Sequence, residues 1–229
     1  MSVRQKVPED LTARKALALE VIDRLKKEYP DAGCTLDYAH AWQLLVSVRL
    51  AAQCTDARVN IVVEDLFAKY PSVAALAAAE PEDIEAIVKP CGLGHSKARD
   101  ISACMRMLRD KYDCQVPATF EELLALPGVG RKSANLIMGD VFGKPAIVTD
   151  THCIRLCNRI GLVDGIKEPQ KVEMALWKII PPEEGSDLCH RFVMHGRAVC
   201  NARKPECEKC CLNDICRYAR EQSGADTAQ

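Results

Sequence analysis

Residues 126–137 read LPGVGRKSANLI, a short break between two stretches with the apolar periodicity of helices. Upstream, Thr119-Phe-Glu-Glu122 fits a capping box, which predicts a short helix that runs through Ala125. Helical periodicity resumes at Lys132 and continues to Val141. The pattern therefore predicts a helix, a tight glycine hairpin and a second helix.

The glycines of this hairpin suggest a role beyond connecting two helices. Gly128 and Gly130 allow positive φ and would expose backbone N–H groups ahead of a helix N-terminus, which suits a phosphate. An ordinary helix–helix turn is the alternative, because glycine often ends helices. Arg131 and Lys132 follow at once and add positive charge, but both interpretations stay open at this point.

The rest of the chain predicts an almost purely helical protein. It has 229 residues, of which 48% are hydrophobic and only 5% aromatic, enough for one large domain or two small ones. No long stretch alternates apolar and polar residues, so β-sheet is not expected. Helical spacing predicts helices over residues 18–29, 41–52, 56–70, 72–79, 81–88, 96–112, 119–125, 132–141, 151–159, 170–179 and 187–199.

The sequence also indicates a soluble, intracellular protein without a membrane partner. Charges interrupt the N-terminal stretch MSVRQKVPEDLTARKALALE, where a signal peptide would be apolar, and no apolar run is long enough to span a membrane. Most of the 13 cysteines are scattered singly through apolar helical surroundings, as reduced thiols would be.

The net charge of −1 hides an asymmetry along the chain. Six acids face two lysines over residues 60–90, whereas seven Lys/Arg face three acids over residues 190–220. Residues 126–160 hold five bases against two acids. A polyanion would therefore be attracted to the second half of the chain.

Lys132 and Asp150 are candidate catalytic residues. An amine nucleophile must be neutral, whereas an ordinary lysine with a pKa near ~10.4 is almost fully protonated at neutral pH. The helix N-terminus, the neighbouring Arg131 and partial desolvation would all favour the neutral amine of Lys132. Asp150 could stabilise positive charge on a sugar or steer protons, or it could simply cap the helix that starts at Thr151.

Four cysteines near the C-terminus have the spacing of a metal site: Cys200, Cys207, Cys210 and Cys216. So many thiols in a loop-rich segment of a reduced protein are hard to explain as packing. Only one C-x2-C pair occurs, so both zinc and an iron–sulfur cluster remain open. Cys211 is expected to be a spare, and Arg203 with Lys204 would present two positive charges from the longest loop between ligands.

With these residues in view, the chain resembles the endonuclease III family of helix-hairpin-helix glycosylases. LLVSVRLAAQCTDARVN, LPGVGRKSANLI, VTDTHCIRLCNRIGL and HGRAVCNARKPECEKCCLNDIC carry the resemblance, which runs from about Leu17 to Tyr218. It implies an all-α fold of two lobes with a DNA cleft between them. A six-helix barrel would span residues 34–144, with the helix-hairpin-helix at about 119–141. Residues 1–33 and 145–229 together would form the iron–sulfur cluster domain.

The same match implies the site residues. Lys132 would be the nucleophile, Asp150 the essential carboxylate, and the four cysteines the ligands of a [4Fe–4S] cluster. Gln53 would fill the space left by an extruded base, and Leu93 would be a wedge against the opposite strand; a polar helix end and a buried loop anchor are the alternatives for these two. The implied DNA-binding residues are Gln53, Leu93, Gly128, Val129, Gly130, Arg131, His152, Arg203 and Lys204.

The implied function is base excision repair by a monomeric, bifunctional enzyme. It would remove oxidised or ring-saturated pyrimidines from double-stranded DNA and cleave the abasic site by β-elimination through a lysine Schiff base. The resemblance implies a bacterial or archaeal cytoplasmic protein associated with the nucleoid.

Three alternatives fit the residues less well. Adenine glycosylases of this superfamily carry a catalytic Glu where this chain has Val48, and they lack the hairpin lysine; thymine-mismatch enzymes also replace that lysine. A non-catalytic DNA-binding module is the alternative from another class, and the pairing of Lys132 with Asp150 argues against it.

Overall fold

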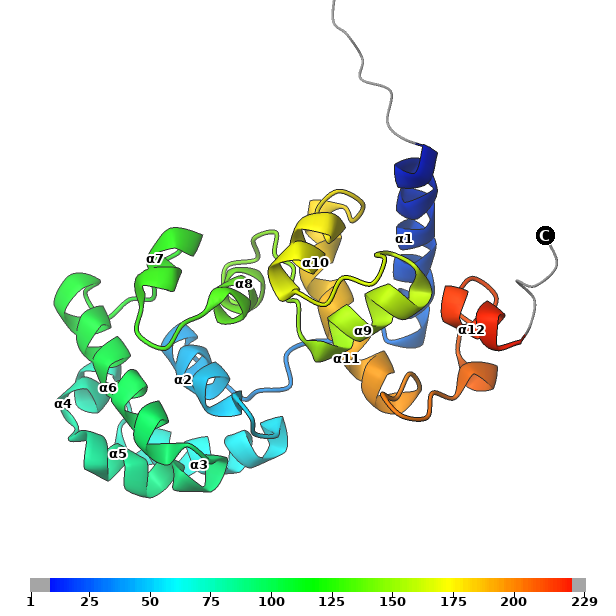
Figure 1. Ribbon diagram of the computed structural model, residues 1–229. Coiled ribbons are helices and arrows are strands. Elements are labelled where there is room, and N and C mark those ends of the chain that lie inside the picture. Colours follow the sequence, from blue (N-terminus) through cyan, green and yellow to red (C-terminus); the bar gives the residue numbers. More distant parts are fainter. Residues whose placement is uncertain (1–8, 224–229) are drawn as a thin grey trace, which may run out of the picture. The chain divides into compact units, whose positions relative to one another are not determined.

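The structure, a computed structural model, describes residues 9–223, so residues 1–8 and 224–229 of the expected cluster domain lie outside the described residues. The described residues form helices and no β-strand, which confirms the all-α prediction (Figure 1). The chain divides into two compact units, Cys34–Lys144 and Met1–Gly33 with Pro145–Gln229. Across residues 9–223, no helix is both long and apolar enough to cross a membrane.

The unit of residues 34–144 surrounds a core of aliphatic side chains. Its central helix, α2, is buried nearly all round, including Trp42 and Leu50, as the sequence predicts. Helix α6 packs against α4, α5 and α2, and α2 also packs against α8 (Figure 1). The elements are α2 Ala41–Ala51, α3 Asp56–Lys69, α4 Val73–Ala78, α5 Pro81–Val88, the 3-10 helix η1 Lys89–Cys91, α6 Gly94–Lys111, α7 Phe120–Ala125 and α8 Arg131–Asp140.

Local hydrogen bonds explain where several of these helices begin. Thr55 accepts a hydrogen bond from the Arg58 backbone N–H at 3.3 Å and so caps α3. Thr119 accepts one from the Glu122 N–H at 3.3 Å, and its hydroxyl donates to the Glu122 carboxylate at 2.6 Å. The sequence predicts the start of α7 because these interactions involve residues only three positions apart.

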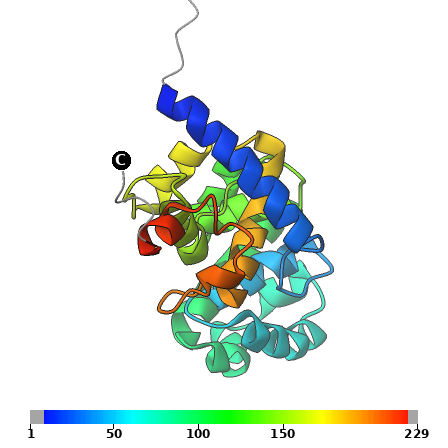
Figure 2. The same cartoon turned by 90° about the vertical axis from the view of Figure 1, so that its right-hand side faces the viewer.

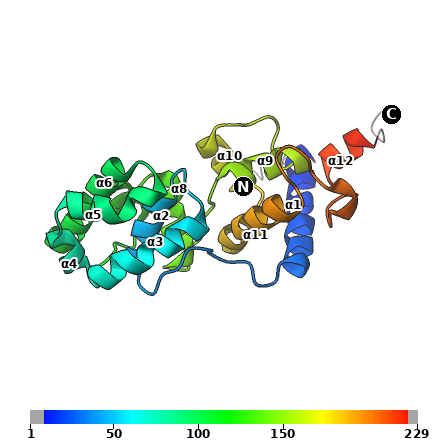
Figure 3. The same cartoon turned by 90° about the horizontal axis from the view of Figure 1, so that it is seen from below.

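The other unit is built around α11. This helix packs against α1 and α9, and α9 also packs against α12 (Figure 2, Figure 3). The elements are α1 Glu9–Glu28, α9 Thr151–Ile160, α10 Pro169–Leu176, the 3-10 helix η2 Pro182–Glu184, α11 Gly185–Ala198, the 3-10 helix η3 Cys207–Lys209 and α12 Arg217–Gln222.

Some helix bounds differ from the prediction for physical reasons. Helix α6 begins at Gly94 instead of Ser96, because Leu93 adopts a left-handed conformation and serves as its N-cap. The short helix α12 is not predicted. Its first residue, Arg217, donates to the carbonyl oxygen of Asn158 on α9 at 2.8 Å, a contact that local sequence does not encode.

Candidate functional site

The sequence-predicted hairpin lies between α7 and α8. Gly128 has φ +75°, which is the conformation for which glycine was expected. Gly130 is the N-cap of α8, and no side chain caps this helix start. The first backbone N–H groups of a helix lack partners within the helix, so they are available to an anion.

An ion pair between Arg49 and Asp100 lies next to Gly128 of the hairpin. The Arg49 guanidinium contacts the Asp100 carboxylate at 2.8 and 2.9 Å, and both side chains are largely buried. A Cβ at Gly128 would lie 2.9 Å from the Asp100 Cβ and 3.2 Å from the Arg49 side chain. Gly128 is therefore required both by its φ and by this close approach.

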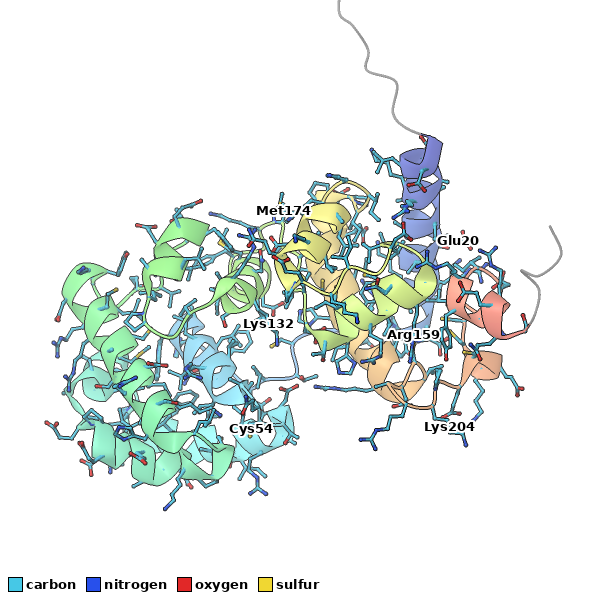
Figure 4. All side chains as sticks on the ribbon, viewed as in Figure 1. Glu20, Cys54, Lys132, Arg159, Met174 and Lys204 are labelled. Atoms are coloured by element: carbon cyan, nitrogen blue, oxygen red, sulfur yellow. The ribbon has the colours of Figure 1, made fainter. Side chains whose placement is uncertain are left out.

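The two basic residues of the hairpin begin α8. Arg131 stacks over the Phe120 ring, with 5.0 Å between its guanidinium carbon and the ring centroid. Lys132 is the second residue of α8, and its side chain is exposed (Figure 4). The partial desolvation of Lys132 that would favour its neutral amine stays a prediction, which concerns the enzyme bound to DNA.

Gln53 and Leu93 lie on two turns of the same unit. Both have left-handed backbone conformations, with φ +57° and +50°, and both are exposed. Leu93 is 56% exposed, so it is not the buried loop anchor that was the alternative to a wedge. Non-glycine residues with positive φ are strained, and such strain often marks a functional position.

Asp150 belongs to the other unit and caps α9. Its Oδ1 accepts a hydrogen bond from the Cys153 backbone N–H at 2.7 Å, which confirms the capping role that the sequence left open. The residues before it, Ala146 to Thr149, are buried, and the Val148 N–H donates to the Cys189 sulfur at 3.2 Å. The carboxylate is thus held at a fixed point by its own helix and by a buried strand-like segment.

His152 lies in the first turn of α9, against Gly196 of α11. Arg155 approaches the His152 Nδ1 at 3.1 Å and donates to the carbonyl oxygens of Gly196 and Cys200 at 3.1 and 3.0 Å. A Cβ at Gly196 would lie 2.4 Å from the His152 Nδ1. The absence of a side chain at Gly196 is what allows α9 and α11 to pack this closely.

The four cysteines of the predicted metal site line one cavity. Cys211 is not among its lining residues. Within residues 9–223, no group of three or more His, Cys, Asp or Glu side chains has the geometry to hold a metal ion. The four sulfurs nevertheless line one shared hollow, and thiolates are the donor type that iron–sulfur clusters use.

Three of the four thiols have pKa values above that of an ordinary cysteine. Burial raises the pKa of Cys207 and of Cys216, and contact with the Cys211 thiol together with burial raises that of Cys210 to about 12. A bound cation would have to displace these protons, since thiolates are the form that ligates metals.

Two basic side chains that the sequence analysis missed contact the sulfurs. Arg159 on α9 donates to the Cys200 sulfur at 3.3 Å and to the carbonyl oxygens of Asn201 and Ala202 at 2.7 and 2.8 Å. Its guanidinium also stacks on Tyr218 at 4.9 Å. The spacing of Arg155 and Arg159, one helical turn apart, was the signal that could have revealed this face of α9.

The second basic side chain that contacts a cysteine sulfur is His195, which is 1% exposed. Its Nε2 lies 3.2 Å from the Cys210 sulfur and its Nδ1 lies 3.0 Å from the Tyr29 hydroxyl. Burial raises the pKa of Tyr29 to about 12, so the phenol is protonated and can donate to Nδ1. The Nε2–H is then the donor to the sulfur.

Arg203 and Lys204 lie in the loop between Cys200 and Cys207, and both are exposed. Lys204 is labelled in Figure 4. The contacts of Arg159 with Asn201 and Ala202 hold the loop immediately before them. Both charges are therefore presented to solvent from a restrained loop.

The chain matches the model of a known family. Residues 46–182 match the family described as HhH-GPD superfamily base excision DNA repair protein. Endonuclease III of Synechocystis sp. is 43% identical over 211 residues, which cover 92% of this chain and 96% of that protein. Endonuclease III of Escherichia coli K12 is 38% identical over 204 residues, which cover 89% of this chain and 96% of that protein.

Comparison with solved structures gives the same family. A trapped endonuclease III–DNA covalent intermediate has a TM-score of 0.86 and 41% identity, and the match covers 91% of this chain and 98% of that one. A non-covalent endonuclease III–DNA complex also has a TM-score of 0.86, with 40% identity, covering 92% of this chain and 98% of that one. The chain therefore belongs to the endonuclease III family, within the HhH-GPD superfamily, and is a base excision repair enzyme, a DNA glycosylase and abasic-site lyase.

Proposed function

We propose that the enzyme removes oxidised or ring-saturated pyrimidines from duplex DNA, with Lys132 as nucleophile and Asp150 as the essential carboxylate. The observation that carries the proposal is the position of Lys132, an exposed amine in the first turn of α8, directly after the glycine hairpin. The related structure described as a trapped covalent intermediate with DNA supports a covalent mechanism.

The reaction begins when the damaged nucleotide leaves the base stack, because C1′ is not reachable inside the duplex. The Lys132 amine forms a bond to C1′, and the C1′–N bond breaks, so that the base leaves with the bonding electrons. Bound DNA supplies the desolvation that the exposed Lys132 side chain lacks and thereby favours its neutral form. Asp150 stabilises the positive charge that grows on the sugar and steers the proton released by the amine.

Strand cleavage follows from the same covalent bond. The sugar ring opens to give a protonated Schiff base between Lys132 and C1′. Removal of a proton from C2′ then moves an electron pair toward C3′, and the C3′–O bond breaks to release the phosphate. The enzyme is thereby both a glycosylase and a lyase that acts by β-elimination.

DNA binding is assigned to elements of both units. Gly128, Val129, Gly130 and Arg131 are assigned to a backbone phosphate at the start of α8. The Val129 N–H donates to the Leu126 carbonyl oxygen at 3.1 Å, so the donors assigned to the phosphate are the N–H groups of Gly128 and Gly130 and the Arg131 side chain. Gln53 fills the space left by the extruded base and Leu93 enters the opposite strand. His152, Arg203 and Lys204 complete the DNA-binding surface, the last two through phosphate contacts that carry no sequence information.

We assign a [4Fe–4S] cluster to Cys200, Cys207, Cys210 and Cys216, since these four thiols line a single cavity. These cysteines would hold the cluster from the segment after α11, from η3 and from the two segments that flank Cys210 and Cys216, so the Arg203–Lys204 loop would be restrained at both ends. Arg159 and His195 contact the Cys200 and Cys210 sulfurs and would offset the negative charge of these ligands. Residues 145–229 with 1–33 are accordingly the cluster domain, and residues 34–144 the helical barrel domain.

The purified protein should be yellow-brown, with broad absorption near ~400 nm and iron and sulfide in equal amounts. Elemental analysis and the visible spectrum test this. The variant Cys211→Ser is the matched control and should retain the colour, whereas Cys210→Ser should lose it. A colourless protein with one bound zinc ion would contradict the cluster assignment.

The substrate class is tested with duplexes that each contain one defined lesion. Ring-saturated and oxidised pyrimidines should be released and the strand nicked, whereas undamaged DNA should remain intact. Borohydride added during the reaction should trap the enzyme on the DNA, because it reduces the Schiff base. Preferential release of a mispaired adenine or thymine, without nicking, would contradict the proposal.

We further propose that the enzyme acts as a monomer in the cytoplasm of a bacterium or archaeon, on DNA of the nucleoid. The bacterial origin of the related endonuclease III proteins supports this assignment. Gel filtration of the purified enzyme, with and without a lesion duplex, tests the oligomeric state.

A further inference from the structure

The helical unit contains a lysine whose ammonium is buried. Lys97 is 0% exposed and is the largest fully buried side chain among the described residues. Burial lowers the pKa of the Lys97 ammonium, which reflects the loss of hydration. A buried ammonium is unfavourable unless hydrogen bonds replace its water, so the groups around it identify what it stabilises.

The ammonium joins two separate segments of the chain. Its Nζ donates to the carbonyl oxygen of Leu50 at 2.8 Å and to that of Cys91 at 2.8 Å. Leu50 lies in the last turn of α2, and Cys91 is the last residue of η1. Carbonyl groups at helix ends lack partners within the helix and carry partial negative charge, so a cation there is favourable.

Each of these carbonyls lies just before a residue that is assigned to enter the duplex. Gln53 follows Leu50 by three residues and Leu93 follows Cys91 by two. The Lys97 backbone N–H also donates to the Leu93 carbonyl oxygen at 3.0 Å, and the Ser96 hydroxyl does so at 3.2 Å. The Lys97 side chain thus contacts the segments that lead into both turns, and the Lys97 backbone also contacts the Leu93 turn.

Both turns are in strained conformations that need such restraint. Gln53 and Leu93 have φ +57° and +50°, although neither is glycine. A strained conformation persists only where surrounding contacts determine it. Both side chains are exposed, so their own packing does not provide that restraint, whereas the backbone contacts of Lys97 do.

We propose that Lys97 is a positioning residue for base extrusion, whose buried ammonium holds the Gln53 turn and the Leu93 turn at a fixed separation. Both side chains are then placed to enter the duplex together. The inference rests on the proposed roles of Gln53 and Leu93. The general reason is that a site works best when its contacting groups are held in place before binding.

The decisive experiment compares two substrates of one variant, Lys97→Met, which keeps the aliphatic stem and removes all three donors. Release of a paired, ring-saturated pyrimidine from duplex DNA should fall by about 100-fold, because small misplacements have effects of this size. Nicking of an abasic site in a single-stranded oligonucleotide should stay near the wild-type rate. This substrate has no base to extrude and no opposite strand to separate.

A fluorescent readout follows extrusion itself. With 2-aminopurine opposite the lesion, wild-type binding should raise fluorescence as the base loses stacking, and Lys97→Met should give a smaller rise. Lys111→Met, which removes an exposed lysine from the same helix, is the matched control and should behave as wild type in every assay.

A second variant keeps the test valid if Lys97→Met does not fold. Lys97→Gln retains two N–H donors on a shorter side chain. Its activity on the duplex should lie between that of wild type and that of Lys97→Met. Equal losses on the duplex and on the single strand, or no loss on either, would overturn the inference. Full duplex activity of a Gln53→Ala, Leu93→Ala double variant would instead overturn the proposed roles of those two side chains.

Discussion

Lys132→Gln should abolish both strand nicking and the borohydride-trapped adduct on abasic DNA. The amide of Gln is not nucleophilic and cannot form a Schiff base, so the covalent route is lost entirely. Binding to a lesion duplex should remain within a few-fold of wild type, since the hairpin N–H groups and Arg131 are still present. The measurements are denaturing gels of nicked and trapped DNA, together with a binding titration.

The matched control for this variant is Lys111→Gln, which removes an exposed lysine from α6 in the same unit. It should nick and trap as wild type does. Normal nicking by Lys132→Gln would assign the nucleophile to another residue and would remove the main support for the proposed mechanism. Loss of binding together with loss of nicking would indicate that Lys132 acts mainly as a phosphate contact.

Asp150→Asn should slow base release by about 100-fold or more, a typical effect of losing a positioned acid–base group. Asn caps helices about as well as Asp, and it can accept the same hydrogen bond from the Cys153 N–H, which is now 2.7 Å long. The melting temperature should therefore stay close to that of wild type. Single-turnover base release at saturating enzyme and thermal unfolding are the two measurements.

Asp150→Ala separates the two roles of this residue. It removes the cap as well as the charge, so the free energy of unfolding should fall by about 1 kcal/mol in addition to the loss of activity. If Asp150→Asn releases the base at the wild-type rate and only Asp150→Ala is impaired, Asp150 is a helix cap and has no part in the chemistry.

Much of the candidate site could be predicted from the sequence, because its signals are local. The capping threonine of α7, the positive φ of Gly128 and the capping role of Asp150 each depend on residues within a few positions. The spacing of the four cysteines likewise indicated a shared site, and these thiols do line one cavity. Such features are determined by backbone geometry and short-range hydrogen bonds.

The sequence was a poor guide to the environment of single side chains. The exposure of the Lys132 side chain has no local signal, since solvent access depends on which distant segments cover a residue. Lys97 lies near the start of the helix predicted over residues 96–112, and only the fold turns its side chain toward the interior. The left-handed conformations of Gln53 and Leu93 were also unpredictable, because neither residue type favours them.

The sequence by itself determined the all-helical class, the glycine hairpin with its lysine, the helix cap at Asp150 and the cysteine spacing. Only the tertiary structure decided which carbonyls the Lys97 ammonium bridges and that Arg159 and His195 contact the cysteine sulfurs. These contacts join residues 47 positions apart for Lys97 and Leu50, and 41 for Arg159 and Cys200. Contacts over such separations form when packed helices exclude water from a shared core, and a single sequence carries no local signal for them.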